Sequence, residues 1–143
     1  MTGTSTPSVL FVCVKNGGKS QMAAGLMRQI AGATVEVHSA GTTPGAVVNA
    51  FSAQALLEVD VDITGEKPTS VDYDLANDVD VVVTLGREVR LDPLPGVRIE
   101  NWDTDEPSER GIDGIERMRL IRDDITARVH RLHRDLTATP HPA

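Results

Sequence analysis

The chain has 143 residues, of which 40% are hydrophobic and 24% charged, and its formal net charge is −7. These values are typical of one globular domain (residues 1–143), and the acidic balance excludes a broad nucleic-acid-binding face, which needs clustered positive charge. No apolar run approaches the length of a membrane span, and we expect no signal peptide. The single cysteine cannot form an internal disulfide, so we expect a cytoplasmic protein that acts away from membranes.

The first half of the chain alternates between predicted strands and helices. Ser8–Val12 is a continuous apolar run, typical of a strand buried on both faces. A helix is predicted over Ser20–Ala31, a second strand over Thr34–His38 and a second helix over Asn49–Val59. The side chains expected on the apolar face of that second helix are Phe51, Ala55, Leu56 and Val59.

The segment that follows contains two more predicted strands. Ser70–Asn77 is compatible with a short helix, and Val79–Leu85 is a clear core strand that ends at Gly86. Leu91–Gly96 contains two prolines and is predicted to be a connection. Val97–Trp102 is predicted as the fourth strand.

A long helix is predicted at the end of the chain. It follows an acid-rich loop over Asp103–Gly111, and Asp113 with Glu116 three residues later is similar to a capping box. The apolar stripe of this helix comprises Ile115, Met118, Ile121, Ile125, Val129 and Leu132. We expect residues 1–7 and 137–143 to be flexible tails.

The alternation of strands and helices predicts an α/β fold, with a four-stranded parallel sheet flanked by helices on both faces. Ligands bind such sheets at the carboxyl ends of the strands. Cys13, Ser39, Gly86 and the acids of Asp103–Glu106 all fall at predicted strand ends. A site is therefore expected at that edge. No set of His, Cys, Asp and Glu residues has the spacing of a metal site.

The chain's only thiol lies between the first strand and the first predicted helix. Cys13 is followed by a glycine-containing loop, Val14, Lys15, Asn16, Gly17 and Gly18, and then by Lys19 and Ser20. Unpaired N–H groups and the helix dipole favour an anion at such a loop, and the same field stabilises a thiolate. Cys13 is therefore a candidate nucleophile above which an oxyanion can bind. A buried structural thiol is the alternative.

The end of this segment is similar to a nucleotide-binding loop, because Gly18-Lys19-Ser20 matches the last three positions of G-x-x-x-x-G-K-[ST]. Cys13 stands where that motif needs its first glycine. In addition, Val79–Leu85 runs into Gly86 and not into an acid that would hold Mg²⁺. We therefore reject a nucleotide triphosphatase.

Three segments resemble the low-molecular-weight protein tyrosine phosphatases and the arsenate reductases that share their fold. Cys13–Ser20 is similar to the family's C-x-x-x-x-x-R-S loop, Ser39–Thr42 to its S-A-G-T segment, and Trp102–Pro107 to the reductases' W-x-x-D-D-P segment. The resemblance implies that Asn16 holds the loop's backbone and that Ser20 hydrogen-bonds the thiolate. Ser39 belongs to a supporting segment.

Two positions depart from the family pattern. Lys19 stands where the family has an arginine. The planar guanidinium of arginine binds two oxygens at once, whereas the ammonium of lysine is a mobile point charge. Lys15 can add a second positive charge. The general acid of the family precedes a proline; that position is Glu106 here, and Asp105 comes one residue earlier. Both are candidates for the proton donor.

The resemblance implies an arsenate reductase that uses Cys13, with no bound cofactor and with arsenate or a phosphate-like oxyanion as ligand. The thioredoxin-coupled relatives use three cysteines, whereas this chain is most similar to single-cysteine, mycothiol-dependent reductases of the arsenate–mycothiol transferase type. The expected partners are therefore mycothiol and a mycoredoxin or glutaredoxin-like protein, and Cys13 either bonds arsenic or assists the small thiol. A phosphatase and a non-catalytic oxyanion binder are the alternatives; few aromatic residues argue against the first.

Overall fold

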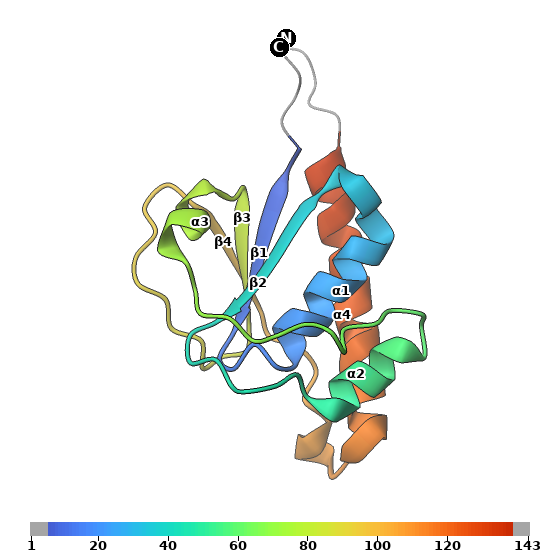
Figure 1. Ribbon diagram of the computed structural model, residues 1–143. Helices are drawn as coiled ribbons and strands as arrows, with labels where there is room; N and C mark the ends of the chain where they lie inside the picture. The colour runs from blue at the N-terminus through green and yellow to red at the C-terminus, as the bar shows by residue number, and fades with distance from the viewer. Residues whose placement is uncertain (1–5, 139–143) are drawn as a thin grey trace.

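Four parallel strands form the centre of the computed structural model, which describes residues 6–138 (Figure 1). Their order in the sheet is β2-β1-β3-β4, and all three neighbouring pairs are parallel. The strands are β1 (Ser8–Cys13), β2 (Glu36–Gly41), β3 (Val81–Leu85) and β4 (Arg98–Trp102). The central strands β1 and β3 are buried along their whole length, as their continuous apolar sequences predict. The predicted fold class is confirmed.

Helices cover both faces of this sheet. One face carries α1 (Lys19–Ala31), α2 (Ala50–Leu57) and α4 (Gly114–Thr137), and the other carries the short α3 (Tyr73–Asp78), as Figure 1 shows. Alternate side chains of β1 enter the two cores on either side of the sheet. Short 3₁₀ helices, η1 (Gly32–Thr34) and η2 (Pro107–Arg110), complete the elements.

The register of the strands brings the predicted site residues to one edge. Cys13 is the last residue of β1 and pairs with Gly41, the last residue of β2. On the other side, β3 ends at Leu85 opposite Trp102 of β4. The loop after Cys13 and the acids after Trp102 therefore leave the sheet at the same end.

Some predicted boundaries are wrong for local reasons. The second strand is Glu36–Gly41 and not Thr34–His38, because η1 delays its start and its pairing with β1 extends through Gly41. Phe51 is 47% exposed, contrary to the predicted apolar face of α2. That helix buries Ala55 and Leu56, as predicted, together with Ser52 and Ala53.

The start of α4 differs from the predicted capping box. Asp113 occupies the N-cap position, but its side chain accepts no capping hydrogen bond. Gly114 has a φ of +66°, so the backbone at this helix start is not regular.

The flexibility of the predicted tails stays a prediction, because most of their residues lie outside the part of the chain that the structure describes. Residues 1–5 and 139–143 lie outside the described residues, but Pro7 accepts a backbone hydrogen bond from Glu36, and Thr137 is the last residue of α4. Among residues 6–138, no helix combines the length and the apolar character needed to cross a membrane.

Candidate active site

The thiol of Cys13 lies at the end of β1 with a relative exposure of 9%. Two donors converge on its sulfur: the Ser20 hydroxyl is 2.9 Å from Sγ, and the Asn16 backbone N–H is 3.2 Å from it. Hydrogen bonds donated to sulfur stabilise the charged thiolate, which is the nucleophilic form.

The direction of the Ser20 hydrogen bond follows from its neighbours. The Asn16 Oδ1 atom accepts from the Thr69 backbone N–H at 2.9 Å and from Gln21 Nε2 at 3.2 Å. The Asn16 Nδ2 atom therefore faces Ser20 and donates to its Oγ at 2.7 Å. Since Ser20 accepts this bond, its own hydrogen is free to point at Cys13. A buried chain of donors thus ends on the sulfur.

Asn16 also fixes the shape of the loop. Its φ of +52° places it in the left-handed region, which asparagine tolerates better than most residues. Full burial of its side chain and three hydrogen bonds hold it there. This geometry supports the role that the sequence resemblance implied for Asn16.

The carbonyl groups of the loop point outward, toward residues 42–49. Cys13, Val14, Lys15 and Gly17 each accept a backbone hydrogen bond from that segment, over distances of 2.6–3.1 Å. In a planar trans peptide the N–H points opposite to the C=O, so the loop's N–H groups turn inward. Within the described part of the chain, no side chain caps the N-terminus of α1 at Gly18. The result is a nest of N–H groups suited to an anion.

Gly41 permits this arrangement. A Cβ atom at this position would lie 2.7 Å from the Val14 oxygen and 2.9 Å from the Asn16 nitrogen. Ser39, predicted as a supporting residue, does not line the pocket. Its backbone oxygen accepts from the Thr69 hydroxyl at 3.1 Å, and Thr69 in turn holds Asn16.

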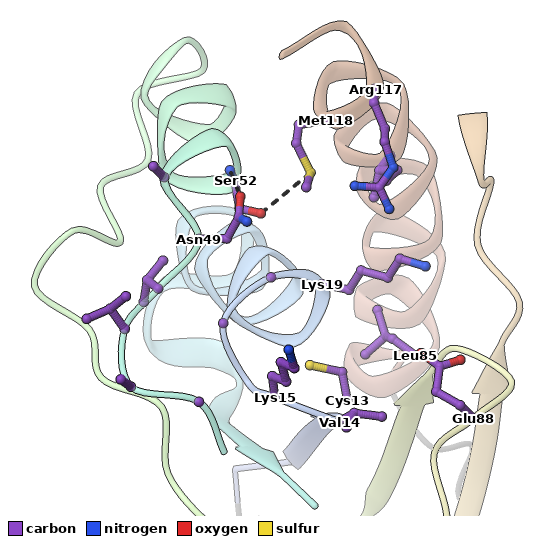
Figure 2. A pocket seen from close by; sticks show the side chains of 18 residues that line it. Cys13, Val14, Lys15, Lys19, Asn49, Ser52, Leu85, Glu88, Arg117 and Met118 are labelled. Carbon is purple, nitrogen blue, oxygen red and sulfur yellow. Dashed lines mark hydrogen bonds between the residues drawn. The ribbon is translucent and has the colours of Figure 1, made fainter. Parts of the chain in front are cut away.

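A pocket of about 790 Å³ opens above the sulfur (Figure 2). All predicted loop residues line it except the buried Asn16, and they include Lys15 and Lys19. The opposite wall comes from residues 45–50, from Leu85 and Glu88, and from α4. A tetrahedral oxyanion fills only part of such a volume, which is typical of pockets for larger ligands.

The two predicted acids lie at different places. The Glu106 carboxylate contacts Lys19 Nζ at 3.5 Å and receives two bonds from Arg117, Nε at 3.0 Å and Nη2 at 3.1 Å. Asp105 instead pairs with Arg110, with N–O distances of 2.8 Å and 3.1 Å. Neither carboxylate lines the Cys13 pocket; Glu106 lies behind the cations that do.

Both carboxyl groups are held in their ionised form. The Arg110 hydrogen bonds lower the pKa of Asp105 below its usual range, against a smaller opposing effect of burial. Burial raises the pKa of Glu106, but hydrogen bonds from Ser108 and Arg117 and the nearby positive charges outweigh it, so that its pKa is lowered. A proton donor here must gain its proton during the reaction.

Several site residues are not evident from the sequence. Arg117 and Met118 come from α4 and Glu88 from the segment after β3, and all three line the pocket. The sequence pattern places Met118 on the apolar stripe of the final helix, and Arg117 is one of 14 basic residues with no motif around it. Among residues 6–138, no group of three or more His, Cys, Asp and Glu side chains is placed to hold a metal ion.

Comparison with known proteins agrees with this geometry. Residues 8–141 match the family model described as low molecular weight phosphotyrosine protein phosphatase. Arsenate reductase 1 of Staphylococcus haemolyticus is 33% identical over 133 residues, which cover 90% of this chain and 96% of that protein. The arsenate reductase of Staphylococcus aureus strain N315 is 33% identical over 128 residues, covering 87% of this chain and 94% of its own.

A solved structure shows the same fold. It is the Corynebacterium glutamicum thioredoxin-dependent arsenate reductase, with a TM-score of 0.77 and 30% identity over 94% of this chain; the chain spans 64% of that protein. Together with the cysteine loop, these matches show that the chain belongs to the low molecular weight phosphotyrosine protein phosphatase family.

Proposed function

We propose that this protein is an arsenate reductase in which Cys13 is the nucleophile and an external small thiol, mycothiol, is the cosubstrate. The observation that carries the proposal is a sole cysteine whose sulfur accepts hydrogen bonds from Ser20 and Asn16 beneath a nest of N–H groups. The relatives described above are arsenate reductases, and they support arsenate as the substrate.

The proposed reaction begins as a phosphatase-like step. The Cys13 thiolate attacks arsenic, an S–As bond forms, and one oxygen leaves as water while the loop N–H groups stabilise the other oxygens. We assign the proton donor to Glu106 and not to Asp105, because Glu106 contacts Lys19 of the loop. Its carboxyl group does not line the pocket, so it reaches the leaving oxygen only when its ion pairs with Lys19 and Arg117 open during the reaction. The negative charge of the bound arsenate favours the neutral form of the Glu106 carboxyl. Glu106 can therefore take up a proton when arsenate binds and then donate it to the leaving oxygen.

The external thiol completes the reaction. The mycothiol thiolate attacks arsenic, and Cys13 leaves as a thiolate. A glutaredoxin-like mycoredoxin then attacks the mycothiol sulfur, and the electron pair of the S–As bond stays on arsenic, which leaves as arsenite. Cys13 needs no second cysteine in this sequence. This fits the chain, which contains no cysteine besides Cys13 and has Gly86, a residue without a thiol, directly after β3.

Two features favour this proposal over its alternatives. The described residues that line the pocket include no aromatic side chain to accept a phenyl ring, which argues against a tyrosine phosphatase. The pocket also has room for a cosubstrate beside the oxyanion. The Corynebacterium relative is described as thioredoxin-dependent, so thioredoxin is the electron donor to test against mycothiol. The cytoplasm, where small thiols stay reduced, is the compartment that we propose.

Arsenite formation tests the proposal. Purified protein is incubated with arsenate and either mycothiol plus mycoredoxin or thioredoxin plus its reductase, with Cys13→Ser as the control. We expect arsenite with the first system only, and no hydrolysis of p-nitrophenyl phosphate above the control. Arsenite at the Cys13→Ser level with both systems would refute the proposal.

A further inference from the structure

Arg117 is the one arginine among the described residues that line the Cys13 pocket. It lies near the start of α4, and its side chain is 27% exposed. Figure 2 shows Arg117 and Lys19 along the α4 side of the pocket. A guanidinium therefore enters this site from an element far from the loop in sequence.

One edge of this guanidinium is anchored and the other is available. Nε and Nη2 donate to the two oxygens of Glu106, which is the paired geometry that a guanidinium forms with a carboxylate. Nη1 has no hydrogen-bond partner within residues 6–138. Because Glu106 itself does not line the pocket, it can fix Arg117 from behind while Nη1 remains free to bind a ligand.

The same carboxylate couples Arg117 to the loop. Lys19 Nζ and Arg117 Nη2 both contact Oε1 of Glu106, at 3.5 Å and 3.1 Å. The two cations are thus neighbours, and Lys19 belongs to the loop whose N–H groups surround the anion site. An oxyanion in that loop lies within the field of both positive charges.

We propose that Arg117 binds the oxyanion above Cys13 and supplies, from α4, the planar guanidinium that position 19 lacks. Lysine offers one mobile charge, whereas a guanidinium held on one edge presents fixed donors to an oxyanion on the other. Glu106 acts as the positioning residue for Arg117. The inference rests on the proposed function only in taking a tetrahedral oxyanion as the ligand.

Phosphate protection of Cys13 from alkylation tests this role without requiring turnover. The measured quantity is the phosphate concentration that halves the rate of iodoacetamide labelling, normalised to the rate without phosphate. The variants are Arg117→Gln and its control Arg119→Gln. Arg119 belongs to the same helix but pairs with Glu58 and does not line the pocket. Each is made in the wild type and in Glu106→Gln.

We expect Arg117→Gln to raise the half-protecting phosphate concentration by about tenfold or more in the wild type, because a hydrogen bond between charged groups is lost. In Glu106→Gln the same substitution should have a smaller but measurable effect, because Arg117 keeps its charge there but loses the paired contact that positions it. Arg119→Gln should leave it unchanged. An effect of Arg117→Gln that disappears in Glu106→Gln would mean that Arg117 only neutralises Glu106, which would overturn the inference. Should Arg117→Gln not fold, Arg117→Lys is expected to weaken protection severalfold, and unchanged protection would refute direct binding.

These results separate the inference from the proposed function. Phosphate protection that depends on Arg117, without any arsenite formation, would refute the reductase and leave the inference standing. Arsenite formation with phosphate protection that is independent of Arg117 would refute the inference and leave the reductase standing. If phosphate does not protect the wild type, the inference fails, whereas the proposed function is decided by arsenite formation alone.

Discussion

Removing the Ser20 hydroxyl is the sharpest perturbation of the nucleophile. Ser20 is fully buried, and its Oγ, 2.9 Å from the Cys13 sulfur, is one of only two donors that the described residues direct at it. A hydrogen bond to a charged group contributes about 1.5–3 kcal/mol. About 1.4 kcal/mol corresponds to a factor of ten, but a thiolate that loses a hydrogen bond also becomes more nucleophilic, so about half of this free energy appears in the rate. Ser20→Ala should therefore slow the reaction of Cys13 at neutral pH by about fourfold to fifteenfold.

The same substitution has a second consequence for stability. Asn16 Nδ2 donates to Ser20 Oγ at 2.7 Å and loses its acceptor when the hydroxyl is removed. An unsatisfied buried donor costs about 1–3 kcal/mol, so the free energy of unfolding should fall by a similar amount. Reactivity and stability are therefore expected to fall together.

Iodoacetamide labelling followed by mass spectrometry measures the reactivity, because Cys13 is the chain's only cysteine. Ser52→Ala is the matched control: Ser52 is also fully buried and lines the pocket, but its hydroxyl contacts Met118 Sδ at 3.5 Å and not Cys13. We expect the control to react like the wild type. If Ser20→Ala is labelled as fast as the wild type, the hydroxyl does not stabilise the thiolate, and the reasoning fails.

Three further substitutions test the loop, its support and the ion pairs. Lys19→Arg should lower the half-protecting phosphate concentration severalfold in the labelling assay, and an unchanged value would show that this position does not limit oxyanion binding. Gly41→Ala should lower the free energy of unfolding in urea by about 1–3 kcal/mol, because its Cβ would lie 2.7 Å from a loop carbonyl oxygen. Gly45→Ala, with 3.8 Å to its nearest neighbour, is the control, and an equal loss in both would contradict the steric argument. A hydrogen bond from Arg119 lowers the pKa of Glu58 to about 2, so this pair stabilises the protein above about pH 4.5, and the stabilisation is lost as the pH falls toward 2. Glu58→Gln should reduce that part of the pH dependence in urea titrations, and an unchanged profile would contradict the assignment.

Local features of the sequence were enough to predict the sheet and the loop. The apolar run before Cys13 forms a fully buried strand, and the glycines and lysines after it form the pocket floor. The strand and the loop each form from residues that are neighbours in the sequence, so the pattern and spacing of those residues are enough to predict them. The roles of Asn16 and Ser20 came from the family resemblance, and the hydrogen bonds in the structure support them.

Contacts between distant segments could not be predicted in the same way. Arg117 reaches the pocket only because α4 packs against α1 and α2, more than 90 residues after the loop in sequence. The sequence placed Phe51 on a buried face, but the packing of α2 turns it outward. Likewise, the sequence named Glu106 as an acid without showing that two cations contact its carboxylate.

The central claim is that the Cys13 sulfur and the surrounding N–H groups together bind a tetrahedral oxyanion. A crystal structure of the protein soaked in arsenate tests it most directly, because arsenic is identified by its anomalous scattering. We predict arsenic directly above Cys13 Sγ, with its oxygens bound by backbone N–H groups of residues 14–19 and by Arg117. Arsenate bound elsewhere, or a loop whose carbonyl groups face the sulfur, would contradict the account.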